Sequence, residues 1–185
     1  MDNFLEEVAT KRNKGSQTIA YIFANVLMIL SGIWAFITLQ VLMLAFQGNM
    51  GTGEIIYNVV LFLATACITV LLFLNRDKIK TEYEYTFTNG TMDFAQVYNN
   101  KKRKNLGTMN IKNVEAMGLV NSGSFNRYIN MPGVKRHNWF ANRDGNLFYI
   151  YYEKDQARNI IIMEPSQEMI DLIRGAVPQG SFQIN

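Results

Sequence analysis

The side chains that could perform catalysis are few, and their spacing does not favour it. The single histidine, His137, lies in the segment KRHNW, and the serines nearest to it in sequence, Ser122 and Ser124, lie in no G-x-S-x-G turn of the kind that presents a nucleophile. Glu82 and Glu84, two residues apart, could supply half of a metal site, but they also fit the solvated face of a strand. We therefore expect no enzyme activity, no metal and no cofactor.

The other common signatures of chemistry are missing from the sequence. It contains no glycine-rich phosphate loop, no HExxH pair and no CxxC pair, so nucleotide and zinc sites lack their usual ligands. Cys67 is the only cysteine, which excludes an intramolecular disulfide.

Clustered basic residues are the feature that most favours a binding function. Eight basic residues and only one acidic residue, Glu115, lie from Lys101 to Arg136, in a chain with a net charge of only +3. The candidate contact residues, for an anionic surface or a partner, are Lys101, Lys102, Arg103, Lys104, Arg127, Lys135, Arg136, Trp139 and Arg143. Near anionic lipid each cation contributes about 1 kcal/mol. Alternatively, the basic residues lie in solvated loops without a binding role, and Trp139 covers the core of a sheet instead of anchoring a partner. Nucleic acid is not expected, because aromatic residues are not interleaved in the basic run.

Two uncharged runs, from Gly15 to Gly53 and from Ile55 to Asn75, must position these groups. About 20 apolar residues span a bilayer as a helix. The runs predict transmembrane helices at residues 19–46 and 55–74, joined by a short external loop at 47–54.

Charges flanking the two runs predict their orientation. Basic residues precede the first run and follow the second, and the loop between them has none. The positive-inside rule then places both termini in the cytoplasm of a two-span cell-membrane protein. We expect residues 1–18 to form a cytoplasmic amphipathic leader, either a short helix on the membrane surface or a frayed segment.

The remaining residues, 81–185, predict a small cytoplasmic domain. TEYEYTFT at 81–88 alternates as a half-buried strand, and Asn89-Gly90 favours a tight hairpin with Phe87 opposite Met92. The same register sets Tyr83 against Gln96, where a bulge would restore the alternation.

Further strands are predicted at 106–111, 114–120, 146–153 and 158–163, with a polar turn at 99–105 and an irregular segment at 121–145. A C-terminal helix is expected near 165–177, with Pro165 at its first position. The predicted fold class is α+β: a transmembrane hairpin followed by a small antiparallel sheet or partial barrel closed by a C-terminal helix.

Four segments resemble known proteins: TEYEYTFTNGTMDF, VYNNKKRKNLGTM, MPGVKRHNWF and MEPSQEMIDLIR. Together they are similar to an uncharacterised bacterial family of short two-span membrane proteins, a family of unknown function. The order of spans, sheet and closing helix also resembles bacterial membrane proteins with a domain like the pleckstrin-homology (PH) domain. The resemblance implies a PH-like fold and a membrane location, and no active-site residues.

The expected function is therefore a membrane-anchored PH-like module that binds a protein partner or anionic lipid at the inner leaflet. The alternative is a structural subunit or self-associating scaffold of a membrane complex, because Ser31-Gly32 and Gln40 could pack against other helices.

Overall fold

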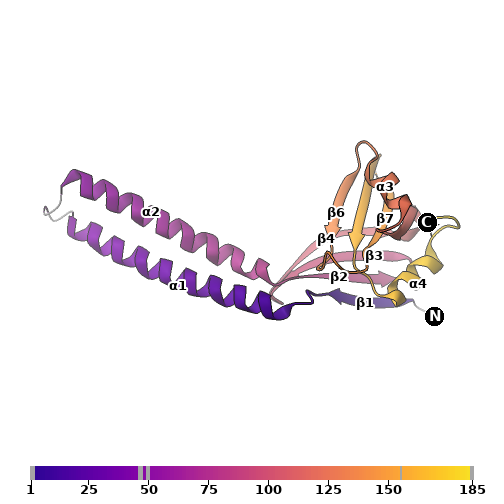
Figure 1. Cartoon of the computed structure of the whole chain (residues 1–185), viewed down its shortest axis with the longest axis horizontal. Helices are drawn as coiled ribbons and strands as arrows, with labels where there is room; N and C mark the ends of the chain where they lie inside the picture. Colours follow the sequence, from indigo (N-terminus) through magenta and orange to yellow (C-terminus); the bar gives the residue numbers. More distant parts are fainter. Residues whose placement is uncertain (1–2, 46–47, 49–50, 155, 184–185) are drawn as a thin grey trace. The chain divides into compact units, whose positions relative to one another are not determined.

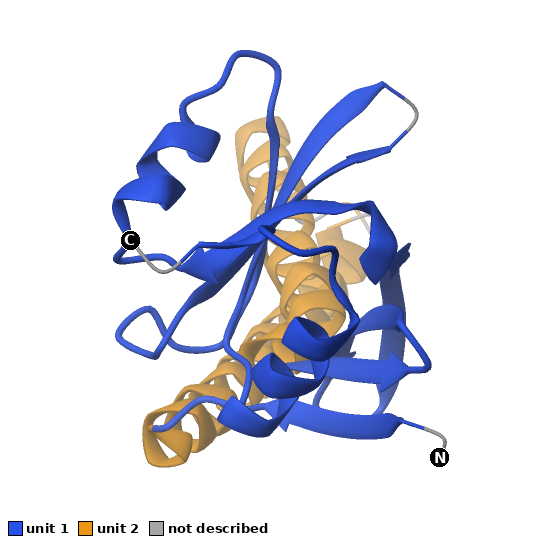
Figure 2. Ribbon diagram, turned by 90° about the vertical axis from the view of Figure 1, so that its right-hand side faces the viewer, with its two compact units in different colours: residues 1–12, 81–185 blue, residues 13–80 orange. Residues whose placement is uncertain are grey.

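The computed structural model describes residues 3–45, 48, 51–154 and 156–183, and it divides into two compact units. Residues 13–80 form one unit, and residues 1–12 together with 81–185 form the other (Figure 2). We call the second unit the PH-like unit, after the fold that the resemblance implies. It is assembled from two separate stretches of the chain, because the helical hairpin is inserted between its first and second strands.

The hairpin unit contains two long apolar helices, α1 (Lys14–Leu44) and α2 (Thr52–Asn75), and α2 continues into a 3-10 turn, η2 (Arg76–Ile79) (Figure 1). Asn13 caps α1 by accepting a hydrogen bond from the backbone N–H of Ser16 at 3.0 Å. Both helices are long and apolar enough to cross a bilayer. Part of the expected loop at 47–54, residues 47, 49 and 50, lies outside the described residues.

Small and polar side chains pack the two helices against each other. The Thr69 hydroxyl donates to the Ser31 hydroxyl at 2.8 Å, and a Cβ on Gly32 would lie 3.6 Å from the Thr69 methyl. Six residues closer to the start of α1, the Asn25 side chain accepts a hydrogen bond from Arg76 at 2.7 Å. Ser31 and Gly32 are therefore used inside the hairpin, while Gln40 is exposed.

The PH-like unit contains two sheets. The first has the order β1-β2-β3-β4, from β1 (Phe4–Ala9), β2 (Thr81–Thr88), β3 (Thr91–Tyr98) and β4 (Lys102–Asn110). The second has the order β6-β8-β7-β5-β9, from β5 (Val114–Leu119), β6 (Lys135–Trp139), β7 (Phe148–Lys154), β8 (Ala157–Met163) and β9 (Phe182–Gln183). Neighbouring strands are antiparallel except β6 with β8 and β5 with β9, which are parallel.

The main core lies on the inner faces of both sheets and is closed by helix α4 (Gln167–Ala176). Tyr85 and Phe87 from the first sheet and Ile161 from the second are almost fully buried in it, together with Met169 and Ile173 of α4. A second cluster covers the opposite face of the second sheet, where helix α3 (Gly123–Ile129) packs on it. Ile160 and Ile161 are therefore buried on opposite faces of β8, which explains the continuous apolar run in that strand.

The local hairpin prediction is confirmed in detail. Asn89 and Gly90 have φ values of 48° and 87°, and Phe87 pairs with Met92. The bulge, however, is not in the β2–β3 pair. It lies between β3 and β4, where Leu106 is skipped, because Phe94 pairs with Gly107 and Ala95 pairs with Asn105.

Residues 4–9 form a strand, so both alternatives for the predicted leader, a short surface helix and a frayed segment, are wrong for these residues. β1 pairs antiparallel with β2, with Leu5 opposite Phe87 and Ala9 opposite Tyr83. Leu5, Glu7 and Ala9 are half-buried and the residues between them are exposed. The N-terminal segment therefore places Leu5 and Ala9 on the inner face of the first sheet as its edge strand, instead of on one face of a helix.

Three further boundaries differ from the sequence predictions. Residues 102–105 extend β4 instead of forming a turn, because they continue the pairing with β3. The segment 121–145, predicted to be irregular, contains α3 and β6. Ser166, not Pro165, sets the start of α4, since its side chain accepts from the N–H of Met169 at 3.1 Å.

Candidate functional site

The β3–β4 turn presents three exposed lysines, Lys101, Lys102 and Lys104. Asn99 and Asn100 adopt φ values of 50° and 53°, a conformation that asparagine tolerates well. The N–H of Lys101 donates to the Tyr98 carbonyl at 3.0 Å, which closes the turn. We call these three lysines the basic turn.

The strand register places the basic turn at one particular end of the first sheet. Tyr98 pairs with Thr81 on one side and with Lys102 on the other. Thr81 is the first residue of the PH-like unit after the hairpin. The basic turn therefore lies at the end of the first sheet where β2 begins, and the Asn89-Gly90 turn lies at the opposite end of the same sheet.

Arg103 is separated from the three lysines by the alternation of the strand. Lys102 and Lys104 share one face of β4, and Arg103 points to the other. There its Nε donates to Glu84 at 2.7 Å. The charge of Arg103 is thus partly matched by an acidic neighbour, so we exclude it from the basic turn.

The structure does not bring the other predicted contact residues into the same patch. Arg127 lies on α3, where its guanidinium is 5.8 Å from the Tyr128 ring centroid. Arg136 is exposed on β6, and Arg143 is exposed in the loop that follows it. Lys135 and Trp139 instead line a common groove beside β4. The sequence cluster is therefore divided among several surfaces.

A groove of about 430 Å³ lies between the edge strand β4 and the inner face of the second sheet. Residues 106–109 of β4 line it from the first sheet, and residues of β6, β7 and β8 line it from the second. Trp139 and Phe94 both line the groove, with their ring centroids 4.8 Å apart. Trp139 thus covers the core, as the alternative interpretation of this residue expected, and also lines the groove.

Polar and basic side chains line the rest of this groove. His137 Nε2 lies 3.2 Å from Asn159 Oδ1 and Lys135 and Lys154 are exposed. Burial raises the pKa of Tyr152 above a value at which its hydroxyl is already neutral at physiological pH. None of the described residues that line the groove is acidic. Only the alternation KRHNW hinted at this arrangement, because it puts Lys135, His137 and Trp139 on one face of a strand.

The residues considered for catalysis do not converge. Glu84 is bound to Arg103 on the first sheet, whereas His137 contacts Asn159 on the second. The Ser122 and Ser124 hydroxyls lie 2.8 Å from each other, and no contact joins either of them to His137 in the described part of the chain. No group of three or more His, Cys, Asp or Glu side chains that could hold a metal occurs among the described residues.

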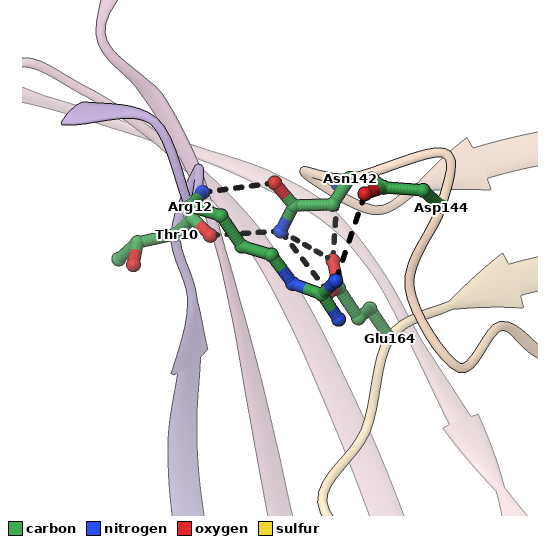
Figure 3. Close-up of polar contacts among 5 residues, drawn as sticks. All are labelled: Thr10, Arg12, Asn142, Asp144 and Glu164. Carbon is green, nitrogen blue, oxygen red and sulfur yellow. Dashed lines mark hydrogen bonds and ion pairs between the residues drawn. The ribbon is translucent and has the colours of Figure 1, made fainter. Parts of the chain in front are cut away.

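A polar cluster ties the N-terminal strand to the rest of the PH-like unit (Figure 3). Asn142, nearly buried, accepts from the N–H of Arg12 at 2.9 Å and donates to the Thr10 carbonyl at 3.0 Å. Its amide nitrogen also donates to the Glu164 carboxylate at 3.0 Å, and Arg12 lies 3.6 Å from Asp144. We call this cluster the Asn142 clamp. It fixes the last residues before the chain enters α1.

A second link joins β1 to the start of α4. The carboxylate of Glu7 accepts from the N–H of Ser166 at 3.1 Å. A carboxylate at this position also interacts favourably with the positive end of the helix dipole. Burial raises the pKa of Tyr85 well above its usual value, and its hydroxyl joins the two sheets by donating to the Trp139 carbonyl.

Comparison with known proteins gives a family match over nearly the whole chain. The model of a family described as a bacterial PH-like domain (DUF6106) matches residues 1–183. Neither the curated proteins nor the solved structures include a significant match.

Proposed function

Because the chain belongs to this bacterial PH-like domain family, we propose that it is a membrane-anchored binding module whose basic turn binds anionic lipid headgroups at the inner leaflet. The observation that supports this most directly is the register of the first sheet. In this register Lys102 is one strand away from Thr81, because both pair with Tyr98, and Thr81 directly follows the last residue of the hairpin unit.

The surface of the hairpin supports the membrane anchor. Large apolar side chains such as Ile33, Phe36 and Val60 are more than half exposed on α1 and α2. An apolar surface of this extent is unfavourable in water and is the surface that a bilayer would cover. Pairing of β1 with β2 supports a hairpin whose two ends lie on the same side of the membrane, since both strands belong to one folded unit.

Charge supports a cytoplasmic location for the PH-like unit. Lys11, Arg12 and Lys14 precede or begin α1, and Arg76, Lys78 and Lys80 follow α2. The positive-inside rule places such flanks in the cytoplasm, where the inner leaflet is anionic. Three lysines near that surface contribute about 3 kcal/mol of attraction in total. The attraction falls off over a Debye length of about 8 Å at physiological ionic strength.

The test measures protection of the basic turn by lipid. The full chain is placed in nanodiscs of neutral phosphatidylcholine or of phosphatidylglycerol mixtures, and amide hydrogen exchange is followed in residues 98–104. We expect slower exchange in anionic nanodiscs, and we expect high salt or the variant K101E/K102E/K104E to remove the difference. Equal exchange in both lipids at low salt would contradict lipid binding by this turn.

The matched control is Lys112→Glu. Lys112 follows the opposite end of β4, where Asn110 pairs with Thr91. The Lys112→Glu substitution also makes the charge more negative, but it leaves the basic turn unchanged. In this variant we expect amide exchange in residues 98–104 to remain slower in anionic nanodiscs than in neutral ones.

The scaffold alternative has less support. Ser31 and Gly32, which suggested contacts with other spans, face Thr69 of the same hairpin. Gln40 remains exposed on α1, so self-association through this residue is a separate proposal. A Gln40→Leu variant with an unchanged oligomeric state in mild detergent would count against it.

A further inference from the structure

We propose that the groove between β4 and β6 binds an extended acidic peptide of a partner protein, which adds as a strand to the free edge of β6. Among the described strands, β6 is the terminal strand of its sheet and pairs only with β8. An edge of this kind presents unpaired backbone N–H and C=O groups and is a template for an added strand. In β6 the groups available for pairing precede the Trp139 carbonyl, which already accepts from the Tyr85 hydroxyl.

Of the two edge strands that line the groove, β6 is better suited than β4 to pair with an added strand. β4 also ends its sheet, but its ladder is interrupted where Leu106 is skipped, and the N–H of Gly107 is already bonded to the Asn105 side chain at 2.9 Å. Bulges of this kind protect an edge from pairing. By contrast, β6 pairs with β8 in unbroken register from Lys135 to Trp139.

The apolar part of the groove lining is suited to an apolar side chain of the peptide. Trp139, Leu106 and Ile161 belong to it, and so does Phe94, whose ring contacts that of Trp139. Alternate residues of an added strand would point toward these groups, because side chains alternate along a strand. A cavity of about 430 Å³ holds a short segment of peptide, within the range of about 300–1,000 Å³ usual for ligand sites.

The charge of the groove selects an acidic peptide. Lys135 and Lys154 line it, and neither makes an ion pair with a described residue. Glu153 lies one residue from both Tyr152 and Lys154, so strand alternation directs it to the other face of β7. The inner face therefore attracts anionic side chains without a competing carboxylate from the described lining.

The experiment selects peptides on the intact protein. A phage-displayed library of random dodecapeptides is panned on the full chain in phosphatidylcholine nanodiscs, and selected sequences are synthesised with a fluorophore for anisotropy measurements. We expect sequences with Asp or Glu beside a bulky apolar residue. We expect K135E/K154E to weaken their binding at least tenfold, and N-methylation of alternate peptide bonds to weaken it comparably.

The control variant K101E/K102E reverses the same number of charges on the basic turn and is expected to leave peptide binding within twofold. Trp139 fluorescence in a Trp34→Phe background reports that each variant is folded. The proposal is overturned if no selected peptide depends on Lys135 and Lys154, or if N-methylation has no effect. It is also overturned if phosphatidylglycerol vesicles displace the peptides from the groove as well as excess unlabelled peptide does.

Discussion

Asn142→Ala tests whether the clamp holds the N-terminal strand in the PH-like unit. The substitution removes an acceptor for the N–H of Arg12, a donor to the Thr10 carbonyl and a donor to the Glu164 carboxylate. A neutral hydrogen bond contributes about 0.5–1.5 kcal/mol and one to a charged group about 1.5–3 kcal/mol. A cavity of about 380 Å³ adjoins the cluster, so water can replace part of the loss. We therefore expect the free energy of unfolding to fall by about 2–3 kcal/mol.

The assay is urea unfolding of the full chain in neutral nanodiscs. Trp139 fluorescence in a Trp34→Phe background reports on the PH-like unit alone, because the two tryptophans lie in different units. Amide exchange at Arg12 gives a local readout, since its N–H donates to the Asn142 side chain. We expect this exchange to accelerate more than exchange in β7.

Two variants show whether the effect arises from the clamp. Asn121→Ala removes an exposed asparagine side chain that makes no contact with the clamp, and it is expected to change stability by less than about 0.5 kcal/mol. Gly145→Ala would place a Cβ 2.5 Å from Glu164 Oε1, which displaces that carboxylate from Asn142. The two clamp substitutions should therefore be less than additive when combined. A loss below about 0.5 kcal/mol for Asn142→Ala, with unchanged exchange at Arg12, would refute the clamp.

Three further outcomes follow from individual side chains. The contribution of Tyr85 to stability should be independent of pH up to about pH 10 and should then fall by up to about 1.4 kcal/mol per pH unit, because the unfolded state loses the proton of Tyr85 while burial raises its pKa in the folded state. The difference between urea titrations of wild type and Tyr85→Phe measures this contribution. Gly118→Ala should separate β9 from β5 and lower the free energy of unfolding by about 1–3 kcal/mol, since the new Cβ would lie 2.7 Å from the backbone oxygen of Gln183. Faster amide hydrogen exchange in β9 would show this. Arg103→Ala should change the unfolding free energy by less than about 1 kcal/mol, because its ion pair with Glu84 is largely exposed on the arginine side; a larger loss would show that the pair supports the sheet.

Local rules predicted the parts of the fold that depend on neighbouring residues. The β2–β3 hairpin follows from alternation and from Asn89-Gly90, and both were read directly from the sequence. β1 was missed because its partner lies beyond the entire hairpin, and its short apolar pattern fits a helix or a strand. The groove and the clamp could not be predicted, because Arg12, Asn142 and Glu164 are brought together only by the tertiary fold.

The insertion of the hairpin between β1 and β2 has a consequence for biogenesis. During translation β1 leaves the ribosome before either apolar helix, and β2 leaves it after both. At a translation rate of about 5–20 residues per second, roughly 4–15 s pass between the synthesis of β1 and that of its partner strand β2. If the helices insert as a hairpin, the two strands meet on one side of the membrane; if one helix fails to insert, they are separated by the bilayer. Closure of the first sheet would then act as a proofreading step for membrane insertion, and a misinserted chain would expose an unpaired β2 edge to the quality-control proteases of the cell.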